Sequence, residues 1–96
     1  MKHILTKLAL FSLLLSTPTM ADQEQYDDCI LGHLKGAKLD LATHLIRQAC
    51  EENYKRSNFT SRKRVAYNNC LLEFLLGVES IQATMEIKAA CARKYD

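Results

Sequence analysis

The stretch YNNCLLEFLLG at residues 67–77 has a near copy at residues 26–36, which read YDDCILGHLKG. Residues 26–54 align with residues 67–95 without a gap over 29 positions, and eleven of these positions are identical. In the first copy the identical residues are Tyr26, Cys29, Leu31, Leu34, Gly36, Ala42, Thr43, Ile46, Ala49, Cys50 and Tyr54. Self-similarity at a fixed spacing indicates an internal duplication. We therefore expect two copies of one structural unit.

Each copy has the pattern of two helices joined by a turn. In the first half of the second copy, apolar side chains recur at positions i, i+3, i+4 and i+7, the spacing of one helix face. These residues are Tyr67, Cys70, Leu71 and Phe74. Gly36 and Gly77 follow, and we expect both to take the left-handed conformation that ends many helices. Asp40 and Ser80 are expected to cap the next helix. The unit is therefore predicted to be a helical hairpin.

The first residues have the layout of a secretory signal peptide. Lys2 and Lys7 precede an apolar run at residues 8–15, and a segment of small residues ends at Ala21. This layout predicts cleavage after Ala21, and the run is shorter than the ~20 residues that span a bilayer. A retained membrane anchor is the alternative. The predicted organisation is a signal peptide at 1–21 and a single mature domain at 22–96, with repeat one at 26–54, a basic linker at 55–64 and repeat two at 65–95.

All four cysteines lie in the repeats, as Cys29 and Cys50 in the first copy and Cys70 and Cys91 in the second. An even number in a short exported chain indicates disulfides, and the close C-x-x-C pairs typical of a metal site are absent. Across an antiparallel hairpin, inward-facing Cα atoms equidistant from the turn lie ~4–5 Å apart, within reach of a disulfide. We predict pairing within each copy. A nested alternative, with the outer two and the inner two cysteines paired, is equally symmetric and stays open.

The predicted fold class is all-α, with two tandem disulfide-closed helical hairpins packed as a small four-helix bundle. The segment at residues 65–76 is apolar on two faces. We expect this third helix to contact both its own partner and the other hairpin, and a homodimer seam is the alternative. Its apolar residues lead us to expect that the second hairpin depends less on its bridge than the first. The repeated tyrosines are interpreted as packing residues.

Charge is balanced in the predicted mature chain, with 11 basic and 11 acidic residues in 22–96. This balance points to no particular class of partner, and we expect no nucleic-acid partner. The linker nevertheless concentrates basic side chains. They are Lys55, Arg56, Arg62, Lys63 and Arg64. These residues are either a solvated loop or a candidate surface for an anionic partner, such as a lipid headgroup, an envelope polysaccharide or an acidic protein.

Residues 26–95 resemble a family of small exported bacterial four-cysteine proteins of unknown function. The resemblance lies in the spacing of Y-x-x-C, glycine, A-T, isoleucine, A-C and tyrosine. The first copy departs from the second at Leu39, where the second has Ser80. The resemblance implies export and a helical fold, and it implies no activity.

No catalytic constellation is visible in the sequence. His33 and His44 correspond to Phe74 and Met85 in the second copy, which favours packing over a metal site. We expect no enzyme activity, no cofactor and no metal. Two hypotheses remain. The chain is either a non-enzymatic interaction module of a periplasmic or secreted location, or a membrane- or envelope-active effector that uses the basic linker and the apolar third helix.

Overall fold

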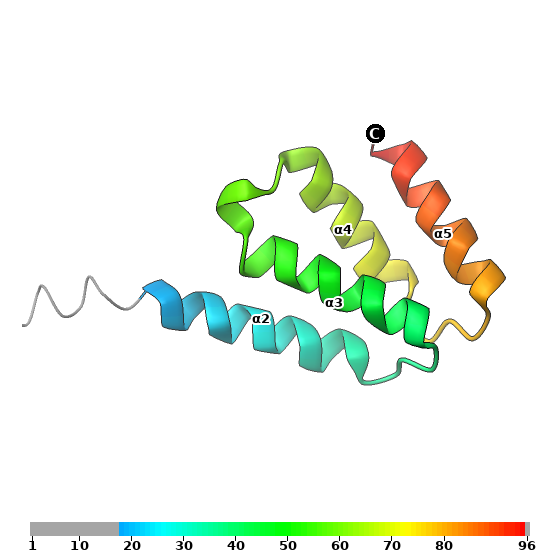
Figure 1. Cartoon of the computed structure of the whole chain (residues 1–96), viewed down its shortest axis with the longest axis horizontal. Helices are drawn as coiled ribbons and strands as arrows, with labels where there is room; N and C mark the ends of the chain where they lie inside the picture. Colours follow the sequence, from blue (N-terminus) through cyan, green and yellow to red (C-terminus); the bar gives the residue numbers. More distant parts are fainter. Residues whose placement is uncertain (1–17, 96) are drawn as a thin grey trace, which may run out of the picture.

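The computed structural model describes residues 18–95, and within them the chain is all-α, as predicted (Figure 1). The helices are α2 (Pro18–Leu34), α3 (Asp40–Tyr54), α4 (Arg62–Phe74) and α5 (Ile81–Lys94), with a short 3₁₀ helix, η1 (Ser57–Phe59), between α3 and α4. Residues 1–17 of the predicted signal peptide lie outside the described residues. Its last four residues form the start of α2.

The four helices pack as two antiparallel hairpins in a small bundle. α2 packs on α3 and α5 packs on α4, while α3 and α4 pack on each other (Figure 1). The central pair therefore consists of the second helix of one copy and the first helix of the next. The prediction that the third helix contacts both hairpins is confirmed, since α4 packs on both α3 and α5.

The core belongs almost entirely to the central pair. Its buried apolar side chains in α3 and α4 are Ala42, Leu45, Ile46, Ala49, Tyr67, Leu71 and Leu72. Among residues 21–34 of α2 only Cys29 is buried, and α5 buries Thr84 and Cys91. Each outer helix thus fully buries little besides its cysteine, while Tyr26, Ile30 and Leu34 of α2 and Ile87 of α5 pack half-buried on the core. The tyrosines all pack on this core, which confirms their interpretation as packing residues.

The two turns differ more than the repeat predicts. Gly77 has a φ of 76°, as expected, but Gly36 does not have a positive φ, so that prediction is wrong. The Ala37 amide instead donates to the Leu34 carbonyl at 3.0 Å, which closes the first turn without a left-handed residue. Ser80 caps α5, because its hydroxyl accepts from the Ala83 amide at 3.0 Å.

The N-cap predicted at Asp40 is wrong. Asp40 is the first residue of α3, and Leu39 occupies the cap position without a side-chain hydrogen bond. The carboxylate still lies in the first turn, where a negative charge complements the helix dipole. α4 has a cap that the pattern did not reveal: the Ser61 hydroxyl accepts from the Arg64 amide at 3.1 Å.

The apolar residues that distinguish the second hairpin are exposed. Phe74 is 54% exposed and Leu76 is 53% exposed. α4 ends at Phe74, so both residues lie at the turn, beyond the helical contacts that bury the rest of α4. The expectation that they make the second hairpin less dependent on its bridge therefore loses its physical basis.

We predict instead that each bridge holds its own outer helix. Paired Cys29→Ala and Cys50→Ala substitutions should release α2, and the same change at Cys70 and Cys91 should release α5, while the central pair stays protected. Each bridge closes a separation of 21 residues, for which loop entropy contributes about 3 kcal/mol. Amide hydrogen exchange measures the result. Equal loss of protection in all four helices would contradict it and show one cooperative unit.

Candidate functional site

The disulfides join each outer helix to a central one. Cys29 is bonded to Cys50 and Cys70 to Cys91, so the pairing within each copy is confirmed and the nested alternative is excluded. The Cα atoms are 5.7 Å and 5.8 Å apart, slightly wider than expected and well within the range that a disulfide accepts.

The histidines do not form a joint site. Nδ1 of His33 lies 2.8 Å from the Cys29 carbonyl oxygen, and its ligand atoms lie within 4.8 Å of the sulfurs of Cys29 and Cys50. Those sulfurs are bonded to each other, so they offer no thiolate to a metal. The packing interpretation is wrong for His44, which is exposed on α3, as is its equivalent Met85 on α5.

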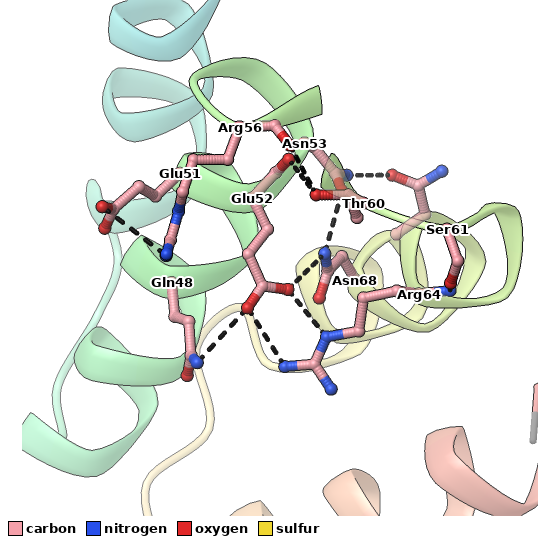
Figure 2. Close-up of polar contacts among 10 residues, drawn as sticks. Gln48, Glu51, Glu52, Asn53, Arg56, Thr60, Ser61, Arg64 and Asn68 are labelled. Carbon is pink, nitrogen blue, oxygen red and sulfur yellow. Dashed lines mark hydrogen bonds and ion pairs between the residues drawn. The ribbon is translucent and has the colours of Figure 1, made fainter. Parts of the chain in front are cut away.

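A polar network joins the two hairpins where α3 ends and α4 begins (Figure 2). Glu52 on α3 accepts from Arg64 Nε at 2.7 Å and from Asn68 Nδ2 at 3.1 Å, both on α4. Asn68 is almost fully buried and also donates to Asn53 Oδ1 at 2.9 Å. Asn53 in turn donates to Asn69 Oδ1 at 3.0 Å. The network fixes the register of α3 against α4.

The charges of this network are stabilised by each other. The hydrogen bond from Arg64 holds the pKa of Glu52 below its ordinary value of 4.5, against the opposing effect of burial. The hydrogen bond to Glu52 raises the pKa of Arg64. The guanidinium also lies 4.7 Å from the centroid of the Tyr67 ring. Burial raises the pKa of Tyr67, so that its hydroxyl stays neutral.

The predicted basic residues differ in whether they have a partner within the chain. Lys55 lies over the Tyr26 ring, 4.3 Å from its centroid, Arg56 is 3.6 Å from Glu51, and Arg64 pairs with Glu52. Arg62 and Lys63, in the first turn of α4, are exposed and form no ion pair with the residues that the structure describes. Three of the five side chains therefore have partners within the chain.

An open groove of about 750 Å³ lies between α3, α4 and α5. Leu45, Ala49 and Leu71 belong to its apolar lining, and Lys63, Arg64 and Lys88 supply positive charge. No aspartate or glutamate is among the lining residues. Lys63 and Arg64 were predicted from the basic linker, whereas Lys88 was not, because it is far from the linker in sequence. The groove is thus an apolar surface with a positive edge.

None of the helices among residues 18–95 combines the length and apolar character needed to span a membrane. Four helices and a disulfide within each hairpin define a small helical four-cysteine fold. The chain matches the family described as four-cysteine protein VF_A0006-like over residues 7–95, and it belongs to that family. Searches of curated proteins and of solved structures found no match.

We predict that stability falls in acid through Glu52. Its pKa is lower in the folded than in the unfolded state, so its contribution is fully present above pH 4.5, its ordinary value, and is lost as the pH falls through the lowered pKa. Glu52→Gln should cost about 2 kcal/mol at neutral pH and flatten this part of the pH profile. Urea unfolding at several pH values measures both effects.

Glu51→Gln is the matched control, because Glu51 is the adjacent residue and its carboxylate is 3.6 Å from Arg56 in a more exposed pair. Exposed pairs contribute less than ~1 kcal/mol. If the two variants had the same pH profile, the acid sensitivity would not come from the network around Glu52.

Proposed function

We propose that this chain is a non-enzymatic interaction module of the cell envelope or the secreted space, and that the groove between α3, α4 and α5 binds an anionic partner. The observation that carries the proposal is the composition of the groove, which Lys63 and Lys88 line without a carboxylate among the lining residues, while Arg64 is paired with Glu52 beside it. An apolar floor with a few charged groups is typical of a ligand or partner site. The partner is an acidic protein segment or an anionic envelope component.

The chemistry of the groove supports binding rather than catalysis. General acids and bases work best with a pKa near the operating pH. The raised pKa values of Arg64 and Tyr67 lie further from neutrality than the ordinary ones. The lowered pKa of Glu52 likewise keeps that neighbouring carboxylate ionised. These shifts hold groups in one charge state, which suits recognition of a partner.

The oxidised cysteines favour a location outside the cytoplasm, since disulfides persist in oxidising compartments. The predicted cleavage after Ala21 agrees with this location and would remove the first turn of α2. Asp22 and Glu24 would then lie at the start of the helix, where negative charge is favourable. Export to the periplasm or the medium is therefore part of the proposal.

We predict that the mature protein begins at Asp22 and is found outside the cytoplasm. N-terminal sequencing and fractionation of the producing cells measure this. An intact Met1 on a membrane-embedded species would contradict the proposed export.

Photo-crosslinking in the producing cell tests the groove. A photoreactive residue at Ala89, an exposed position in the groove, should give a discrete adduct with the partner. Glu73 is the control, because it is exposed on α4 and does not line the groove. No adduct at Ala89, or the same adduct at both positions, would contradict a role of the groove.

A membrane- or envelope-active effector is the second candidate function. The exposed apolar side chains at the turn of the second hairpin favour it, since Phe74, Leu76 and Ile81 are each more than half exposed. A contiguous exposed apolar patch is typical of contact with a membrane or a protein. Salt-reversible cosedimentation with phosphatidylglycerol vesicles, lost in a Phe74→Ser variant, would support this candidate over the first.

A further inference from the structure

We propose that a second copy of this chain docks its α2 on α5 and continues, between molecules, the packing of α4 on α3 within the molecule. The repeat makes α5 the equivalent of α3 and makes α2 the equivalent of α4. Within one molecule α3 carries α4 on the side away from its disulfide partner α2. The equivalent side of α5 carries no helix among the described residues.

The free side of α5 is exposed at the positions that α3 uses for this contact. In α3 the residues Leu45, Ala49 and Glu52 are buried or half-buried. Their equivalents in α5, which are Glu86, Ala90 and Arg93, are all exposed. The equivalent face of α5 is thus uncovered, and it keeps the alanine while Glu86 and Arg93 replace Leu45 and Glu52.

α2 shows the matching half of the same contact. Leu72 of α4 is buried in the central interface, at 6% exposure, while the identical residue Leu31 of α2 is 71% exposed. Asp27, one helical turn before Leu31, is also exposed, whereas its equivalent Asn68 is buried. An exposed leucine beside an exposed carboxylate therefore lies on the face of α2 that α4 uses to bind α3.

When each residue is replaced by its equivalent in the other copy of the repeat, the polar contacts of the central interface become pairs of opposite charge. The bond between Glu52 and Asn68 corresponds to Arg93 of one copy and Asp27 of the next. The bond between Asn53 and Asn69 corresponds to Lys94 and Asp28.

A third contact follows the same rule. Lys38 and Glu79 form an ion pair at 2.7 Å between the two turns of one molecule. Moved by one repeat, this pair corresponds to Glu79 of one copy and Lys38 of the next. Lys38 and Glu79 already pair within each molecule, so the match in charge between α2 of a second copy and the free side of α5 rests on the pairs at Asp27 and Asp28.

The proposed contact joins two different surfaces, so it is head-to-tail and leaves a free α2 and a free α5 at the ends of each assembly. Such a contact continues beyond a dimer unless the rotation closes a ring. Exposed ion pairs each contribute less than ~1 kcal/mol, so the association should be weak, concentration-dependent and reduced by salt. The proposed contact between α2 and α5 uses surfaces other than the groove and is independent of the proposed function.

Charge reversal on each surface tests the contact in the oxidised mature chain by sedimentation velocity at low salt. The wild type should show a mean mass that rises with concentration past that of a dimer. Reversal of the acidic side, D27K with D28K, should weaken association by roughly tenfold or more. Reversal of the basic side, R93E with K94E, should do the same. The four substitutions together restore opposite charges and should restore association.

Two further variants separate this contact from general charge effects. R62E with K63E changes the net charge as much as R93E with K94E but lies on α4, so it should leave association unchanged. Leu31→Ser should weaken association without unfolding the chain through lost burial, because Leu31 is 71% exposed. If either double variant were unfolded, the variant with all four substitutions would not regain association.

The proposal is overturned if the wild type stays monomeric up to millimolar concentration, or if its mass stops at a dimer that both charge reversals leave intact. A dimer of that kind, weakened by Phe74→Ser, would place the contact at the turn of the second hairpin. Failure of the four-fold variant to associate would also overturn the proposal.

Discussion

The two disulfides are the constraint on which the rest of the structure depends, because each one holds an outer helix whose other apolar contacts with the core are mostly half-buried. Of the described side chains of α2 only Cys29 is buried, and α5 buries only Thr84 and Cys91. Two bridges at about 3 kcal/mol each are comparable with the ~4–11 kcal/mol expected for a domain of this length. Since α5 is held to α4 and touches α3 only slightly, the space between α3 and α5 stays open as the groove.

The duplication produces helices of equal sequence pattern in unequal surroundings. Ala49 of α3 is buried in the core, whereas the identical residue Ala90 of α5 is exposed. The cause is that the central pair joins two non-equivalent helices, so each copy contributes one central and one outer helix. Glu52 and Asn68, which link the central pair, are replaced by Arg93 and Asp27 at the equivalent outer positions. At these positions one copy has a neighbour within the molecule and the other does not.

The hairpins and the disulfide pairing could be predicted from the sequence because both depend on spacing within one copy. The placement of one hairpin on the other could not, since it depends on polar residues such as Asn53 and Asn68, which an apolar pattern leaves out. The cap at Asp40 and the conformation of Gly36 were predicted from local residue preference, and the geometry of the first turn overrode both. Lys88 lines the groove only because α5 packs on α4.

The same difference between the copies gives the groove two chemically distinct walls. His44 and Gln48 line it from α3, and their repeat equivalents Met85 and Ala89 line it from α5. One wall therefore offers hydrogen-bonding groups, and the other offers a flexible apolar side chain and a small one. Unequal walls favour one orientation, so the divergence of the copies at these positions gives the groove the asymmetry that specific recognition requires.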